Sequence, residues 1–132
     1  MKPCPYCGNP PEFVTGEAIY PHRPDLFYKK FYLCKPCDAF VGCHAAADKD
    51  GKGGSGDGTV PLGRLANAEL RKYKMAAHTA LDFLWQGGKM SRGKAYRLLA
   101  RKLSLYPDEC HIGMFDVDTC KRVIEICKTG LV

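Results

Sequence analysis

Cys4-Pro5-Tyr6-Cys7-Gly8 opens the chain, and Cys34-Lys35-Pro36-Cys37 repeats its Cys-x-x-Cys spacing further along. Each such turn places two thiolate sulfurs on one side of a tight loop, which is half of a tetrahedral ligand set. Structural zinc takes four ligands in a tetrahedron, and thiolates suit it because they are soft and negatively charged. We therefore expect one structural Zn²⁺, held by Cys4, Cys7, Cys34 and Cys37.

The alternative for these cysteines is a pair of disulfides or redox-active Cys-x-x-Cys motifs. Because the motif begins so close to Met1, we expect no secretory signal peptide, and no stretch approaches the roughly 20 apolar residues of a membrane helix. We therefore expect a cytoplasmic protein, and in a reducing compartment paired cysteines are mostly metal ligands. Thioredoxin-like pairs also precede a helix, and none is expected after either motif. Four thiolates close the zinc coordination shell, so the metal is expected to stabilise the fold.

The segment between the two Cys-x-x-Cys turns has the composition of a β-hairpin. Residues 12–20 and 26–33 are rich in aromatic and β-branched side chains, and Pro21, Pro24 and Asp25 favour a turn between them. Residues 39–41 can form a third short strand. We predict a zinc ribbon over residues 1–44.

Residues 45–61 differ sharply from the ribbon in composition. Their centre has no apolar side chain and is rich in glycine, which predicts a flexible loop. The spacing of a phosphate-binding P-loop is absent. An EF-hand calcium loop starting at Asp48 would need a bidentate glutamate where Thr59 stands.

After the loop the apolar period changes from two residues to 3.6. The pattern predicts three helices, over residues 67–86, 91–104 and 116–130, with Ser91 and Asp116 as N-terminal caps. The expected fold is therefore α+β, with the zinc ribbon followed by a three-helix region over residues 62–132.

The net charge of +6 is concentrated in one part of this helical region. Residues 64–104 hold ten Lys or Arg side chains against only Glu69 and Asp82. Such an imbalance favours a polyanionic partner, DNA or RNA, although charge runs are commonly no more than a solvated face. A helix, a Gly-containing turn and a second basic helix also resemble, schematically, a helix-turn-helix DNA reader. The side chains predicted to contact nucleic acid are Arg64, Arg71, Lys72, Lys74, Arg92, Lys94, Arg97, Arg101 and Lys102.

Four further side chains would form a catalytic site if the protein were an enzyme: His44, His78, Asp82 and His111. Histidines that converge with a carboxylate can hold a metal or exchange protons, but structural histidines are commoner. A second metal site could also use Cys43 and His44 with Cys110 and His111. Cys120 and Cys127 are expected to be small buried apolar residues.

Several motifs together resemble the phage- and prophage-encoded zinc-finger-containing domain family. They are Cys4 to Gly8, Val41-Gly42-Cys43-His44, Pro61 to Ala66, Ala77-His78, and His111 to Asp116. The resemblance spans nearly the whole chain and departs from the family in the Gly-rich loop, which looks like an insertion. It implies a viral or prophage origin and a role in the cytosol of a bacterial host, and it implies no particular activity. The family's presumed zinc ligands fall on Cys4, Cys7, Cys34 and Cys37.

Three functions remain open from the sequence. The first is a non-catalytic nucleic-acid-binding protein in which zinc stabilises the fold. The second is an inhibitor that binds a host protein, such as a defence factor. The third is a metal-dependent nuclease, which has no catalytic motif in its favour.

Overall fold

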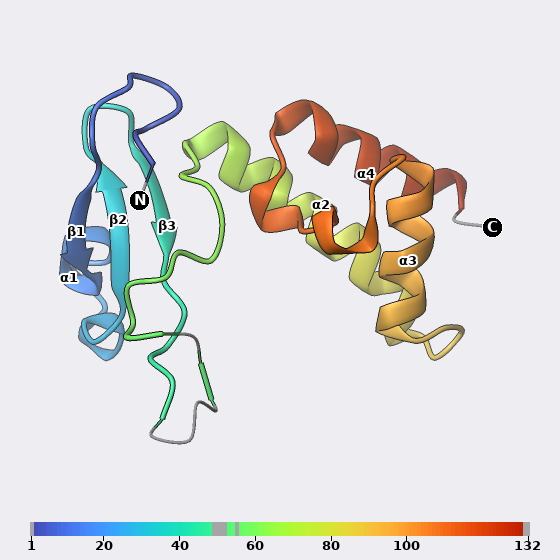
Figure 1. Ribbon diagram of the computed structural model, residues 1–132, viewed down its shortest axis with the longest axis horizontal. Coiled ribbons are helices and arrows are strands. Elements are labelled where there is room, and N and C mark those ends of the chain that lie inside the picture. The colour runs from blue at the N-terminus through green and yellow to red at the C-terminus, as the bar shows by residue number, and fades with distance from the viewer. Residues whose placement is uncertain (1, 49–52, 55, 131–132) are drawn as a thin grey trace. The chain divides into compact units, whose positions relative to one another are not determined.

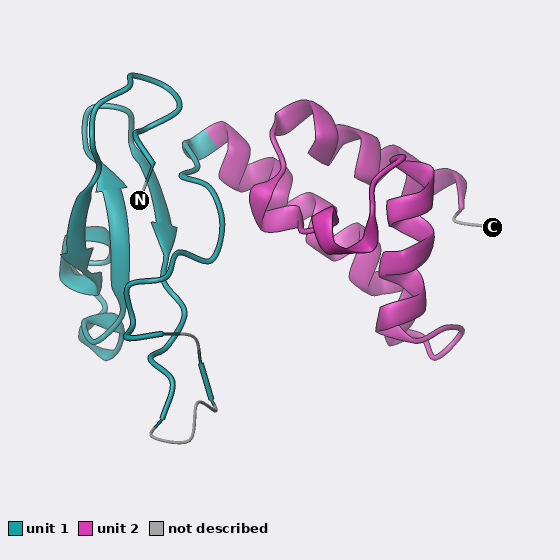
Figure 2. Ribbon diagram, in the orientation of Figure 1, with its two compact units in different colours: residues 1–68 teal, residues 69–132 magenta. Residues whose placement is uncertain are grey.

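The protein is described by a computed structural model that covers residues 2–48, 53–54 and 56–130. The chain forms two compact units, Met1–Ala68 and Glu69–Val132 (Figure 2). The first contains the sheet and the second contains most of the helices, and each is treated by itself.

The first unit is built on a three-stranded antiparallel sheet in the order β1-β2-β3 (Figure 1). Its strands are β1 (Glu12–Thr15), β2 (Lys30–Cys34) and β3 (Ala39–Gly42). Phe13 lies opposite Tyr32, and Tyr32 lies opposite Val41, so these three side chains share one face. The four cysteines of the two Cys-x-x-Cys turns gather beside this sheet. The prediction of a zinc ribbon followed by a helical unit is confirmed.

The first strand is shorter than the sequence predicted. It stops at Thr15, and residues Gly16–Ile19 form one helical turn, α1. Gly16 is buried against the backbone of Leu26, where an added Cβ would collide with the Leu26 carbonyl oxygen. The extended conformation of β1 therefore ends before this close approach. A 3₁₀ turn, η1 (Pro24–Leu26), then precedes β2.

The second face of the sheet carries an aromatic cluster. Phe31 is buried and contacts Tyr20 and Phe40 edge-on, with ring centroids 5.9 and 6.1 Å apart. Phe40 also exchanges two backbone hydrogen bonds with Ala66, of 3.0 and 3.1 Å. In the sequence, Ala66 fits the 3.6-residue apolar period of the helix that follows it, yet its backbone pairs with β3 in the first unit.

The described residues of the Gly-rich segment fold back on themselves. The amide of His44 donates to the carbonyl of Val60 at 2.8 Å, and that of Ala47 donates to Gly56 at 2.9 Å. The hydroxyl of Tyr32 donates to the carbonyl of Thr59 at 2.7 Å. The predicted flexible loop also includes residues 49–52 and 55, which lie outside the described residues.

The second unit contains the three predicted helices, with bounds within two residues of the expected ones. They are α2 (Ala68–Gln86), whose first residue belongs to the first unit, α3 (Arg92–Lys102) and α4 (Val117–Thr129). The two predicted caps are confirmed: the Ser91 hydroxyl accepts from the Lys94 amide at 3.1 Å, and the Asp116 carboxylate accepts from Thr119 at 2.8 Å. Two 3₁₀ turns, η2 (Pro107–Glu109) and η3 (Ile112–Met114), connect α3 to α4.

The core of the second unit comes from the apolar stripes of these helices and from the connection after α3. Cys120 is buried in it, as expected, whereas Cys127 is only half-buried, and Cys110, a candidate for a second metal site, is also buried there. The other fully buried side chains are Leu70, Ala77, Leu81, Ala95, Leu99, Ala100, Ile112 and Val123.

Candidate metal centre

The first Cys-x-x-Cys turn is held by its own backbone. The amide of Gly8 donates to the carbonyl of Cys4 at 2.8 Å, and the amide of Cys4 donates to the carbonyl of Asn9 at 2.8 Å. Gly8 has a positive φ of 79°, a conformation that glycine adopts without strain. This reversal brings the Cys4 and Cys7 sulfurs to the same side of the loop.

The second turn connects β2 to β3. Cys34 is the last residue of β2, and Cys37 lies two residues before β3 begins at Ala39. The amide of Asp38 donates to the carbonyl of Lys35 at 3.2 Å, and Asp38 adopts a positive φ of 50°. The strand pairing therefore fixes where this pair of sulfurs lies.

The four sulfurs form one compact group. They all lie within 4.8 Å of one another, and the Sγ atoms of Cys7 and Cys34 are 3.5 Å apart. Zn–S bonds of about 2.3 Å at tetrahedral angles place sulfurs about 3.8 Å apart, which this spacing fits. Cys4, Cys7, Cys34 and Cys37 bind one structural zinc ion.

Two of the ligands belong to the core of the first unit. Cys4 and Cys34 are buried together with Ala39 and Leu65, and Tyr32 and Val41 pack against this cluster. Cys37 is half-buried and Cys7 is exposed. The metal thus joins the edge of a small apolar cluster to a loop at the surface.

The pKa values of the clustered thiols indicate that the thiolate forms need a bound cation. Burial, followed by the neighbouring thiols, raises the pKa of Cys37 to about 12, and burial also raises the pKa of Cys34. The Asn9 backbone and the Cys34 thiol lower the pKa of exposed Cys7 to about 7. Cys34 and Cys37 would therefore stay protonated at neutral pH by themselves, and a divalent cation supplies the charge that stabilises their thiolates.

A zinc-finger family matches this chain over nearly its full length. The model of the zinc-finger-containing domain family matches residues 1–130. The chain belongs to this family. Searches of curated proteins and of solved structures found no match to this zinc-finger-containing domain. Within the described ranges, none of its helices is long and apolar enough to cross a membrane.

The remaining histidine and cysteine candidates do not form a comparable group. Among the described residues of the zinc-finger-containing domain, only Cys4, Cys7, Cys34 and Cys37 form a cluster of three or more side chains able to hold a metal. His44 belongs to the first unit, whereas His78, Asp82 and His111 belong to the second. Asp82 accepts a hydrogen bond from the indole of Trp85 at 3.0 Å. This bond gives both side chains a structural role.

The basic side chains predicted from the sequence lie on several elements. Arg64 precedes α2 in the first unit, Arg71, Lys72 and Lys74 lie on α2, and the other five lie on α3. The ammonium of Lys74 donates to the carbonyl of Gly113 at 2.6 Å and so connects α2 to η3. The guanidinium of Arg92 lies 4.6 Å from the ring centre of Tyr96.

Two residues that support the zinc site were not predicted from the sequence. Leu65 is 1% exposed and packs with the buried cysteines, although the chain enters α2 only three residues later. The hydroxyl of Tyr6, inside the first Cys-x-x-Cys turn, accepts from the amide of Asn67 at 3.2 Å. In the sequence, Leu65 belongs to the family motif Pro61 to Ala66, and its packing with the buried cysteines gives this part of the motif a structural reason.

Proposed function

We propose that this zinc-stabilised protein binds nucleic acid without catalysis, through the basic surface of its second unit. The observation that carries this proposal is the charge of α3. The helix has five Lys or Arg side chains, all exposed, and no acidic side chain among its 11 residues. An exposed, uncompensated row of cations is what phosphate contacts require.

Several of the cationic side chains of α3 lie on the side of the helix opposite its buried side chains. Ala95, Leu99 and Leu103 are buried at spacings of four, so they share one side of the helix. Lys94, Arg97 and Arg101 fall on the opposite side at spacings of three and four. Among the described residues, none of the α3 cations forms an ion pair with a carboxylate. Their charge is therefore available to an external anion.

A salt titration of binding to labelled duplex and single-stranded DNA and RNA tests this function. Each neutralised phosphate contributes about −0.9 to the slope of log K against log salt on duplex DNA and about −0.7 on single strands. The double variant Arg97→Ala/Arg101→Ala should bind more weakly and should lose about 1.8 from the magnitude of the duplex slope.

The matched control removes the same charge from another helix. Arg122 and Lys128 are exposed on α4, so Arg122→Ala/Lys128→Ala changes the net charge equally. Its affinity and slope should stay close to those of the wild type. Equal losses in the two double variants would show that only net charge matters and would remove α3 as the contact surface.

A second candidate function, inhibition of a host protein, is favoured by an apolar patch on α2. Met75 and Phe83 are 73% and 79% exposed and lie two turns apart on one side of the helix. Large exposed apolar side chains are common at protein interfaces. Capture of a host protein by the wild type, abolished by Met75→Ser/Phe83→Ser but not by Arg97→Ala/Arg101→Ala, would favour this function over nucleic-acid binding.

The biological setting that we propose is a phage or prophage protein acting in the cytosol of a bacterial host. It is supported by the ordered motifs from Cys4 to Asp116 and by the pairing of cysteines as metal ligands, which suits a reducing compartment. Retention of zinc by protein isolated under reducing, cytosol-like conditions, and loss of zinc under oxidising ones, tests the compartment.

A further inference from the structure

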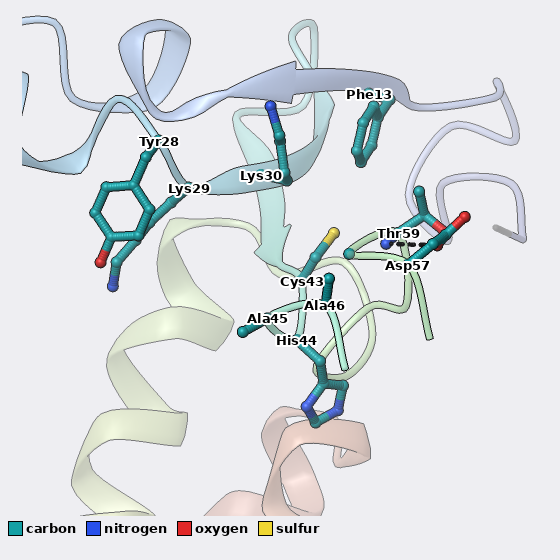
Figure 3. A pocket seen from close by; sticks show the side chains of 11 residues that line it. Phe13, Tyr28, Lys29, Lys30, Cys43, His44, Ala45, Ala46, Asp57 and Thr59 are labelled. Carbon is teal, nitrogen blue, oxygen red and sulfur yellow. Dashed lines mark hydrogen bonds between the residues drawn. The ribbon is translucent and has the colours of Figure 1, made fainter. Parts of the chain in front are cut away.

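An open cavity of about 540 Å³ lies in the first unit, apart from the zinc site (Figure 3). We call it the sheet cavity, because one wall is a face of the sheet and the other is formed by the two described ends of the Gly-rich segment. Its volume falls in the usual range of small-molecule and cofactor sites.

The sheet wall follows from the strand register. Thr15 lies opposite Lys30, and the amide of Cys43 donates to the carbonyl of Lys30 at 3.0 Å. Because side chains alternate along a strand, Phe13, Lys30 and Cys43 lie on one face, which is also the face of Tyr32. The hydrogen bond from Tyr32 to Thr59 fastens the Gly-rich segment over this face.

The cavity has a different chemistry at each end. Figure 3 shows Tyr28 and Lys29 together at one end, and Phe13 near Asp57 and Thr59 at the other. Phe13 is 48% exposed and Tyr28 is 74% exposed, so each presents much of its ring to a ligand. An exposed ring such as that of Phe13 is suited to stacking against a planar group.

The charges of the lining favour an anion with a polar planar part. Lys29 and Lys30 are both exposed, and burial raises the pKa of the Cys43 thiol, which keeps that group neutral. Asp57 is the lining carboxylate, and both of its hydrogen bonds with Thr59 end on Oδ1. Its other oxygen, Oδ2, is not used in these two bonds and can accept a hydrogen bond from an N–H group of a base.

We propose that the sheet cavity binds one nucleotide, with its base stacked on Phe13 and hydrogen-bonded to Asp57, and with its phosphate on Lys29 and Lys30. The nucleotide is either free or an unpaired residue of a single strand. For the single-stranded source, the inference deepens the proposed function and rests on it. It adds a base-contacting site in the zinc-ribbon unit, whereas α3 contacts phosphates.

The test is an NMR titration of the zinc-loaded full chain with adenosine monophosphate, with a short single-stranded oligonucleotide, and with inorganic phosphate. Saturable shifts should appear at the amides of Lys30, Cys43, Ala46 and Gly58 with one or both nucleotide ligands. A stronger response to the oligonucleotide identifies the single strand as the source, and a response to the monophosphate alone identifies a free nucleotide.

Substitutions then assign the two ends of the site. Phe13→Leu should weaken binding about fivefold or more, because base–aromatic stacking is lost, while Phe13→Tyr should restore it. Lys29→Ala/Lys30→Ala should also weaken it. Lys2→Ala/Lys35→Ala removes the same charge from exposed positions outside the cavity and should leave binding unchanged.

Three results would overturn the inference: no saturable shift at millimolar nucleotide, equal midpoints for phosphate and nucleotide, or unchanged binding in Phe13→Leu. The inference and the proposed function fail separately. If the cavity amides do not shift but duplex binding still depends on Arg97 and Arg101, only this site is rejected. If nucleotide shifts occur but the protein has no affinity for duplex or single strands, the proposed function of α3 is rejected.

Discussion

At the scale of single residues, the surroundings favour the charged form of the zinc ligands when the metal is bound and the neutral form of His78. The cysteines need a cation, because four thiolates cannot share so small a volume without one. His78 is exposed on α2, and desolvation by the atoms around it lowers its pKa and favours its neutral form. Both effects can be measured with single substitutions.

Replacing Cys34 with serine should abolish zinc binding and unfold the first unit. Cys34 is buried, contributes one of the four sulfurs and ends the central strand β2, so its loss opens the metal site on which this end of the sheet depends. Structural zinc in small domains supplies about 10–16 kcal/mol, more than a unit of this size can replace by packing. Metal content and amide NMR dispersion measure the outcome.

The matched control is Cys43→Ser, which changes a half-buried cysteine outside the metal group. It should retain one zinc ion per chain and the native sheet signals. Retention of stoichiometric zinc by Cys34→Ser would show that the four-sulfur site is assigned wrongly.

His78 predicts a dependence of stability on pH. Desolvation lowers its pKa below the ordinary 6.5, with Lys74 and Arg92 acting in the same direction and Asp82 opposing them. The unfolded chain therefore binds the proton more readily, so the free energy of unfolding should fall as the pH drops below 6.5 and stay constant above it. The difference between wild type and His78→Gln isolates this contribution from that of the zinc ligands.

An NMR titration of the His78 ring gives the midpoint directly. A midpoint below 6.5 is expected. A midpoint above 6.5 would mean that Asp82 outweighs desolvation, and His78→Gln would then lose stability on acidification relative to the wild type.

At the scale of elements, the sequence predicted the helices well because their end signals are local. Ser91 and Asp116 each precede a run of helical periodicity, and each accepts the amide three residues on. The end of β1 was missed because it depends on Gly16 packing against Leu26, a contact between distant residues that no local pattern shows. The pairing of Ala66 with Phe40 could not be predicted for the same kind of reason, because it joins residues far apart in the sequence.

The N-terminal cap of α3 should contribute measurably to the stability of the second unit. Ser91→Ala removes the side-chain acceptor for the Lys94 amide and should lower the free energy of unfolding by about 1 kcal/mol. Trp85, the single tryptophan, lies on α2 and reports unfolding of this unit by fluorescence in urea.

The control for the cap is Thr79→Ala, at an exposed position inside α2. It should leave stability unchanged or raise it slightly, because alanine favours helix more than threonine does. A loss in Thr79→Ala as large as that in Ser91→Ala would contradict a specific role for the cap.

At the scale of the whole molecule, the two units owe their stability to different sources. The first is small and depends on zinc to complete the cluster around Cys4, Cys34 and Leu65. The second has an apolar core built from three helices. The metal site was predictable from cysteine spacing alone, whereas the sheet cavity was not, because its walls come from strands and a loop that only the fold brings together.

Removal of zinc by a chelator should therefore unfold the two units unequally. We expect hydrogen-exchange protection to disappear from β2 and β3 and to persist in α2, α3 and α4. Binding of duplex DNA through α3 should survive chelation, while nucleotide shifts in the sheet cavity should vanish with the sheet. Restored zinc should recover the protection of β2 and β3 and the nucleotide shifts in the sheet cavity, and added magnesium should not, because thiolates select zinc. If helical protection fell in parallel with that of the sheet, the units would fold as one, and the metal would then also support α3.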